Sequence, residues 1–237
     1  MPEWRGGVKD LRRASAGDPV TATPRRTYGG QSADARRSAR RARLLDAAID
    51  AIADNAWRTL TVDRLCAGAG LNKRYFYESF ANLDEVAAAA VDDIADDVRS
   101  ATVDAAARTA AQPLDRQALA VVDALVRALV DDPRRGRILL GGVAGSPALQ
   151  QHRAKVMRSL TAVLVSHARN VHGVELENDP LAAVAPAFLV GGTADAILAY
   201  LNGRARISID DLVTALTTLW LITGNGAAEV ARHRLGD

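Results

Sequence analysis

The chain has 237 residues, of which 49% are hydrophobic but only 4% aromatic, and its formal net charge is +2. One cysteine, Cys66, excludes an internal disulfide framework, and no uninterrupted apolar run approaches the ~18 residues of a membrane span. Because the apolar residues are mostly Ala, Leu and Val, the composition predicts an all-α protein. We expect it to be soluble and cytoplasmic, without a membrane partner, since the basic N-terminus lacks the apolar core of a secretory signal.

The charge is unevenly distributed. Residues 1–43 hold ten Arg and one Lys against four acidic residues, a net charge of +7, so the remainder carries −5. A basic N-terminal part favours a polyanionic partner at one end of the molecule, although a solvated tail has the same composition. Residues 1–31 lack an apolar period, and we expect a disordered basic extension whose Arg25-Arg26 pair is available to a DNA minor groove.

The first expected helix begins near Ser32. Its apolar residues recur at three- and four-residue steps: Leu44, Leu45, Ala48, Ile49 and Ile52. Five arginines crowd its N-terminal half: Arg36, Arg37, Arg40, Arg41 and Arg43. The positive end of a helix dipole disfavours arginine, so we expect DNA phosphates to explain these residues, with Arg40 as a candidate contact.

Two short helices joined by a glycine turn come next. Thr61 is a suitable N-cap for the first, Gly70 lies in the turn, and Asn72 is a suitable N-cap for the second. This arrangement predicts a helix-turn-helix. The second helix combines Lys73 and Arg74 with four of the seven Phe and Tyr residues of the chain: Tyr75, Phe76, Tyr77 and Phe80. We expect Phe76 and Phe80, four residues apart, to face the core.

From Leu83 onward, apolar periodicity and start signals such as Asp-Pro and Ser-Pro predict a body of long helices. The expected helices span residues 83–109, 114–130, 133–145, 147–172, 180–202 and 208–232. With the three N-terminal helices this gives about nine helices and no convincing strand.

The segment from Arg40 to Ala90 resembles the tetracycline-repressor (TetR) family of transcriptional regulators. Leu44-Leu45-Asp46-Ala47-Ala48 is similar to the family's first-helix core, and Ala69-Gly70-Leu71 matches its helix-turn-helix frame. The resemblance depends most on the spacing of four residues before a long helix: Thr61, Gly70, Tyr77 and Phe80. Arg74 and Tyr75 depart from it, because Gly-Thr is frequent there, and Leu83 replaces a frequent lysine that contacts phosphate.

The resemblance implies a three-helix DNA-binding domain at 32–82 and a helical domain for effector binding and dimerisation at 83–237. It also implies phosphate contacts from the hydroxyls of Thr61 and Tyr77. Lys73 and Arg74, in the first turn of the recognition helix, are suited to guanine edges. Double-stranded operator DNA is the implied partner, and the candidate DNA-binding residues are Arg40, Thr61, Asn72, Lys73, Arg74, Tyr75 and Tyr77.

The body is expected to hold a small effector. Few aromatic residues and few buried charges favour an apolar, aliphatic ligand, with His167 as a polar handle. The candidate ligand-binding residues are Val103, Leu125, Leu139, Val143, Leu160, Leu164, His167 and Phe188.

The last two helices are expected to form a homodimer interface, because the first has small residues and the second a large apolar stripe. An intramolecular helix pair is the alternative. The candidate interface residues are Gly191, Gly192, Asp195, Ala199, Leu216 and Trp220.

Two other functions remain open. The sequence from Asp92 to Asp97 matches the DDxxD pattern by which all-α isoprenoid synthases hold Mg²⁺-diphosphate, with Asp92, Asp93 and Asp96 as ligands. A second Asp-rich helix, a catalytic triad, zinc-ligand spacing and a phosphate loop are absent from the sequence, so we expect no enzyme, cofactor or metal. A DNA-binding protein without an effector is the other alternative, and an apolar cavity in the body would argue against it.

Overall fold

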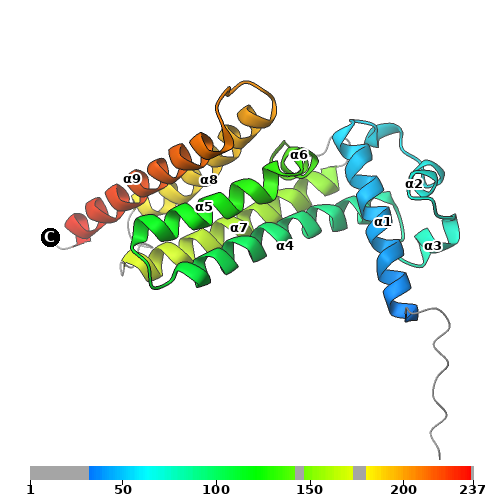
Figure 1. Ribbon diagram of the computed structural model, residues 1–237, viewed down its shortest axis with the longest axis horizontal. Coiled ribbons are helices and arrows are strands. Elements are labelled where there is room, and N and C mark those ends of the chain that lie inside the picture. Colours follow the sequence, from blue (N-terminus) through cyan, green and yellow to red (C-terminus); the bar gives the residue numbers. More distant parts are fainter. Residues whose placement is uncertain (1–31, 142–146, 173–179, 236–237) are drawn as a thin grey trace, which may run out of the picture.

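The computed structural model describes residues 32–141, 147–172 and 180–235. Within these ranges the chain forms nine α-helices, α1 to α9, and no strand. Figure 1 shows a small helical head, α1 to α3, at one end of a long body, α4 to α9. The all-α prediction is therefore confirmed. The expected basic extension, residues 1–31, lies outside the described residues.

Side-chain caps fix where the helices of the head begin. They are α1 (Ala33–Ala53), α2 (Val62–Gly68) and α3 (Lys73–Tyr77), with a 3-10 turn, η1 (Trp57–Thr59), after α1. Ser32 Oγ accepts a hydrogen bond from the amide of Ala35 at 3.0 Å, Thr61 Oγ1 from Arg64 at 3.3 Å, and Asn72 Oδ1 from Tyr75 at 3.2 Å. These caps, of which Thr61 and Asn72 were predicted, satisfy amide groups that have no partner within the helix.

The turn between α2 and α3 requires glycine at position 70. Gly70 has φ +60°, and a Cβ there would lie 2.6 Å from Nη2 of Arg43. Arg43 uses that nitrogen to donate a hydrogen bond to the Gly70 carbonyl at 3.3 Å. A larger residue would be strained by its backbone angle and would also displace the arginine.

The head has a dense core around the aromatic residues of α3. Phe76 is fully buried and Phe80 is 4% exposed, as their spacing predicted. Leu44 and Leu65 complete the contact from α1 and α2. Cys66 is buried as well, and this burial raises the pKa of its thiol. The core therefore holds α3 rigidly against α1 and leaves its opposite face to solvent.

The body has two layers. The first contains α4 (Leu83–Thr109), α5 (Leu114–Val130) and α7 (Pro147–His172), and the second contains α8 (Pro180–Leu201) and α9 (Ile209–Leu235), which pack on α5 (Figure 1). Ser208 caps α9: its Oγ accepts from the Asp211 amide at 3.0 Å. The ends of these helices agree closely with the expected ranges.

One expected helix of the body is divided. The sequence after Asp132 forms only a short α6 (Pro133–Gly136), followed by a π-helical turn, η2 (Arg137–Gly141). Glycine at position 136 allows α6 to approach α5 closely, because a Cβ there would lie 2.6 Å from the Leu129 carbonyl oxygen. The segment thus fits tightly between α5 and α8, next to the head.

Candidate functional site

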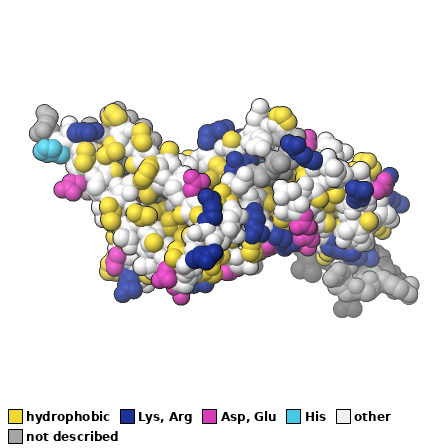
Figure 2. All heavy atoms as spheres, turned by 90° about the horizontal axis from the view of Figure 1, so that it is seen from above, with side chains coloured by type: hydrophobic (Ala, Val, Ile, Leu, Met, Phe, Trp, Pro, Cys, Tyr) yellow, Lys and Arg dark blue, Asp and Glu magenta, His cyan; other side chains and the backbone are white. Residues whose placement is uncertain are grey.

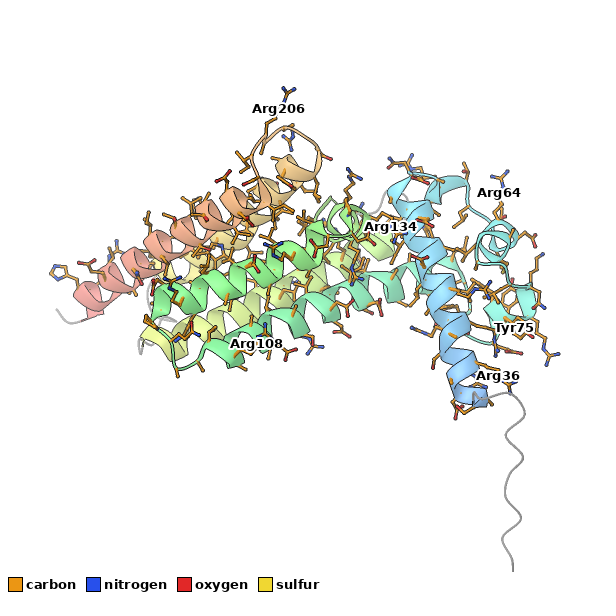
Figure 3. The ribbon with its side chains drawn as sticks, viewed as in Figure 1. Arg36, Arg64, Tyr75, Arg108, Arg134 and Arg206 are labelled. Carbon is orange, nitrogen blue, oxygen red and sulfur yellow. The ribbon has the colours of Figure 1, made fainter. Side chains whose placement is uncertain are left out.

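The outward face of the head carries the predicted recognition residues. Lys73, Arg74 and Tyr77 are exposed on α3, and the Tyr77 side chain is 60% exposed. Figure 3 shows Arg64 on α2 pointing into solvent, whereas Tyr75, on the same short helix as Lys73, is half-buried. The helix-turn-helix thus presents cations and phenols together at the end of the molecule.

Carboxylates lie next to both cations of α3. Lys73 Nζ is 2.8 Å from Asp63 of α2, and Arg74 Nε is 3.1 Å from Glu78. The hydrogen bond to Asp63 raises the pKa of the Lys73 ammonium, which keeps its charge at neutral pH. Exposed ion pairs contribute little stability, so both cations can exchange their partners for phosphate or base edges.

Three arginines of α1 contact other groups of the head. Arg40, a candidate phosphate contact, lies with its guanidinium 4.4 Å from the Tyr75 ring centroid and 3.7 Å from Glu78. Arg41 lies over the ring of Phe80, and Arg43 binds the Gly70 carbonyl. These three residues hold α1 to the helix-turn-helix, which explains why arginine is tolerated in this part of α1.

The two predicted phosphate-binding hydroxyls lie beside helix N-termini. Thr61 begins α2, and Tyr77 borders a shallow depression that Asn82 and Leu83 also line at the start of α4. Helix N-termini favour anions because their amides and dipoles point outward. Asn72 is exposed, but its side-chain oxygen caps α3, so capping is the role its geometry supports.

A cavity of about 300 Å³ lies between the two layers of the body. Four of the eight predicted ligand-binding residues line it: Val103, Leu125, Leu139 and Leu160. Val143 lies outside the described residues, as do the side chains of Leu164 and His167. The prediction that Phe188 lines the cavity is wrong, because this residue is 67% exposed on the outer face of α8.

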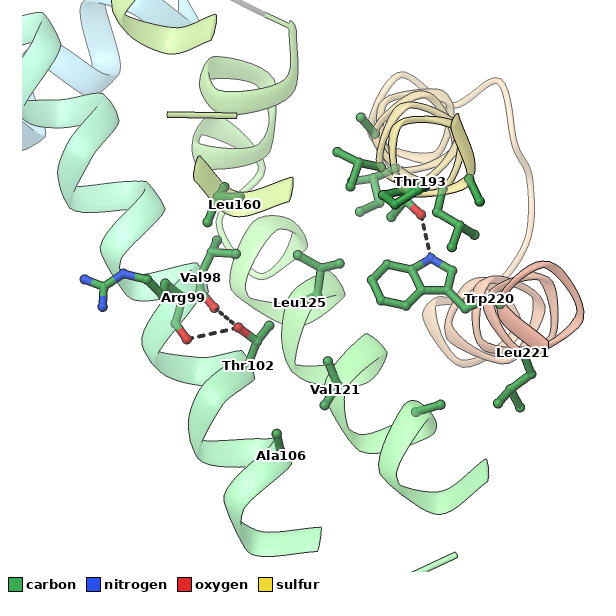
Figure 4. A pocket seen from close by; sticks show the side chains of 18 of the residues that line it. Val98, Arg99, Thr102, Ala106, Val121, Leu125, Leu160, Thr193, Trp220 and Leu221 are labelled. Carbon is green, nitrogen blue, oxygen red and sulfur yellow. Dashed lines mark hydrogen bonds between the residues drawn. The ribbon is translucent and has the colours of Figure 1, made fainter. Parts of the chain in front are cut away.

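Trp220 and Thr193 form a polar pair in the cavity wall (Figure 4). The other polar residues of the wall are Arg99, Thr102, Gln117 and Asn225. The indole Nε1 of Trp220, on α9, donates a hydrogen bond to Thr193 Oγ1, on α8, at 2.8 Å. The sequence suggested Trp220 for the dimer interface because it belongs to an apolar stripe, and nothing in the stripe distinguishes its inner from its outer members. Thr193 was missed altogether, since a lone threonine in an apolar helix gives no signal.

The dimer candidates divide between outer and inner positions. Gly191 and Gly192 are exposed, and a Cβ added to either would meet no atom within 4 Å. Asp195 is exposed and Ala199 is half-buried. The prediction that Leu216 lies in the dimer interface is wrong, because the residue is only 3% exposed within a single chain.

Other large apolar residues occupy the outer face of α8 and α9. Figure 2 shows hydrophobic side chains gathered over this part of the body. They are Val184, Phe188, Leu219, Ile222 and Val230, each between 39% and 67% exposed. The segment Val184–Leu201 of α8 is long and apolar enough for a membrane span by length and composition, and only 22% of it is buried within the chain. Exposed apolar surfaces of this kind mark sites of interaction with a partner or a membrane.

The acidic stretch of α4 is paired with basic groups. Asp92 lies 2.9 Å from His152 of α7, Asp96 lies 2.7 Å from Arg99, and Asp97 contacts Arg135. No group of three or more metal-ligating side chains occurs in the described part of the chain. Asp92 and Asp97 thus connect α4 with α7 and α6, and the carboxylates do not converge on one point.

Arg134 connects the cavity side of the body with the head. From α6 it reaches Asp132 at 2.7 Å, and it reaches Asp46 and Asp50 of α1 at 3.2 and 2.5 Å (Figure 3). The same contacts raise the pKa of the guanidinium and lower that of the Asp132 carboxyl, chiefly through their mutual hydrogen bond. Since η2 follows directly and contributes Leu139 to the cavity, α6 is in contact with both regions.

No protein-family model and no curated protein matches the sequence. Solved structures match its fold. The fatty acid degradation regulator FadR from Bacillus halodurans has a TM-score of 0.61 at 15% identity, over 79% of this chain and 95% of its own. FadR from Bacillus subtilis in complex with stearoyl-CoA has a TM-score of 0.61 at 14% identity, over 77% and 98%. A TetR family transcription regulator from Marinobacter aquaeolei VT8 has 0.55 at 16%, over 82% and 96%. The fold is that of the TetR-family regulators.

Proposed function

We propose that this protein is a cytoplasmic, ligand-responsive transcriptional regulator, most simply a repressor, that binds palindromic operator DNA as a homodimer. The observation that carries the proposal is the exposed group of Lys73, Arg74 and Tyr77 on a short helix that Phe76 anchors in the head. A rigid helix with exposed cations fits the major groove of B-DNA. The similarity of fold to known regulators supports the same function.

Within this proposal, α3 reads base edges while the ends of α2 and α4 bind phosphates. Lys73 leaves Asp63, and Arg74 leaves Glu78, as each reaches DNA. Phosphate contacts supply affinity and base contacts supply specificity. Arg40 packs against the ring of Tyr75 and remains a predicted phosphate contact.

The outer face of α8 and α9 is the proposed dimer interface. Its apolar residues, among them Phe188 and Ile222, would be covered by the same face of a second copy, with Gly191 and Gly192 allowing close helix approach. A twofold dimer would place two copies of α3 roughly 34–36 Å apart, one turn of DNA. In this proposal a second copy of the chain, rather than lipid, covers the exposed apolar surface of α8.

The cavity is the proposed effector site. A volume of about 300 Å³ is at the lower end of small-molecule pockets. Its aliphatic walls favour an apolar effector, and the stearoyl-CoA complex of the Bacillus subtilis protein is an example of a long-chain ligand in this fold. An effector that moves η2 would act on α1 through Arg134 and so change the spacing of the recognition helices.

A nuclease footprint on the DNA upstream of the protein's own coding region tests the proposal, because many such regulators act on neighbouring genes. We expect a protected inverted repeat, and loss of protection when Lys73 is replaced by Ala. Absence of protection on that DNA and on a genomic fragment library, at low salt, would contradict it.

The two alternatives are less well supported. The cavity favours an effector over an effector-free DNA-binding protein. In the described part of the chain no three metal-ligating side chains come together, which disfavours a magnesium-diphosphate enzyme. Magnesium-dependent turnover of a prenyl diphosphate would restore that alternative.

A further inference from the structure

We infer that the effector is an uncharged, mainly aliphatic compound with a carbonyl oxygen, and that this oxygen accepts a hydrogen bond from the hydroxyl of Thr193. The inference rests on the proposed effector site and names the class of ligand that fits it. Thr193 lines the cavity, and it is only 6% exposed.

The hydroxyl of Thr193 accepts one hydrogen bond, but its own proton has no acceptor among the described residues. Its oxygen accepts the hydrogen bond from Trp220 Nε1, and it donates to no group in the described part of the chain. Five other helical threonines donate to the carbonyl three or four residues earlier: Thr102, Thr109, Thr161, Thr217 and Thr218. Thr214 and Thr223 of α9 also lack such a bond, but neither is buried. A buried donor without an acceptor is unfavourable, so a ligand acceptor would complete the hydrogen bonds of Thr193.

Trp220 orients this donor. Because the indole N–H occupies one side of the Thr193 oxygen, the hydroxyl proton must point elsewhere. Figure 4 shows the indole extending from α9 across to α8, with Leu125 of α5 facing it. The threonine and the tryptophan therefore form one fixed unit in the wall, and the unit presents a single donor.

The rest of the wall favours a neutral ligand. Among the described residues that line the cavity, Arg99 alone is charged, and its side chain points away from Thr193 and Trp220 (Figure 4) toward Asp96, 2.7 Å away. The side-chain nitrogen of Gln117 donates to the backbone carbonyls of Ala110 and Gln112. A carboxylate beside Thr193 would thus be desolvated with no cation near it among the described lining residues, whereas a ketone, ester or thioester oxygen needs only the one donor.

A pair of matched probes tests the inference on the full-length protein. 2-Decanone and 2-methyl-1-decene differ only in a carbonyl oxygen that is replaced by a CH₂ group, and decanoate adds a charge. Each would compete with the uncharged fluorophore N-phenyl-1-naphthylamine, in the wild type and in the Thr193→Val, Thr193→Ser and Trp220→Phe variants. The double comparison cancels the different hydrophobicity of the probes.

We expect the ratio of ketone to alkene affinity to fall roughly five- to tenfold in Thr193→Val, the effect of one hydrogen bond. Thr193→Ser keeps the hydroxyl and should keep the ratio, whereas Trp220→Phe removes the N–H that orients the hydroxyl and should lower the ratio, but less than Thr193→Val does. An unchanged ratio in Thr193→Val, a larger Thr193-dependent effect for decanoate, or failure of all probes to bind would overturn the inference. Operator binding by wild type and Thr193→Val separates this result from the proposed function, which fails only if the wild type does not bind DNA.

Discussion

The head and the body of this molecule solve different packing problems. The head, residues 32–82, surrounds a fully buried Phe76 with large side chains and fixes its surface with cation contacts, such as Arg40 over Tyr75. The body retains a cavity of about 300 Å³ between two helical layers. A densely packed region keeps one geometry, which DNA recognition requires, whereas a region with unfilled space can adapt to a ligand.

The largest expected effect comes from removing the aromatic anchor of the head. Phe76→Ala should lower the free energy of unfolding by about 3–5 kcal/mol, because the side chain is fully buried. Chemical denaturation measures this change. The matched control is Phe188→Ala, an exposed ring on the body, which should change monomer stability by under ~0.5 kcal/mol but weaken self-association in sedimentation. Equal stability losses for the two variants would remove the proposed contrast.

The second prediction compares the addition of volume in the two regions. Ala48 is fully buried in the head core, and Ala118 lines the cavity. Ala48→Leu should cost about 1–3 kcal/mol through overpacking, whereas Ala118→Leu should be neutral or stabilising and should block binding of the apolar fluorophore. Thermal unfolding and a fluorescence titration measure both. A strongly destabilised Ala118→Leu protein would mean that the cavity is not open space.

The third prediction concerns the connection between the two regions. Arg134→Gln removes the contacts of α6 with Asp46 and Asp50 of α1. Because the side chain is partly exposed, we expect a stability loss of only about 1 kcal/mol. The effect of an effector on DNA affinity should nevertheless decrease. If DNA release by the effector is as strong as in the wild type, the coupling does not pass through Arg134.

The smallest expected effect is a dependence on pH. The hydrogen bond to Arg134 lowers the pKa of Asp132 from its ordinary value of 3.8. A lowered carboxyl pKa contributes stability that is fully present above the ordinary value and is lost as pH falls below it. Asp132→Asn, which retains a capping side chain, should lose under ~1 kcal/mol at neutral pH and show a weaker loss of stability in acid. An identical acid profile for both proteins would contradict this assignment.

The sequence predicted the head more fully than the body for a physical reason. Helix caps and tight turns need particular residues at fixed spacings, so Thr61, Gly70 and Asn72 were identifiable from the sequence alone. The position of a side chain around a long apolar helix depends on its neighbours in space. Phe188 was therefore assigned to the wrong side of its helix, Trp220 was not recognised as a cavity residue, and Thr193 was not found.

The arginines of α1 show a further limit of the sequence. Their charge suggested phosphate contacts, but Arg40, Arg41 and Arg43 bind groups of the head itself. Composition cannot distinguish a cation that faces a partner from one that stacks on an aromatic ring of the same chain.

The central claim is that the exposed face of α3 binds DNA, and a salt-dependent titration of a labelled duplex tests it most directly. Lys73→Ala should weaken binding and lower the slope of log affinity against log salt by about 1 if Lys73 meets a phosphate, or weaken binding by about 1–3 kcal/mol if it meets a base. Lys155→Ala, an exposed lysine of α7, is the control and should match the wild type. Equal affinities and slopes for all three proteins would contradict the account.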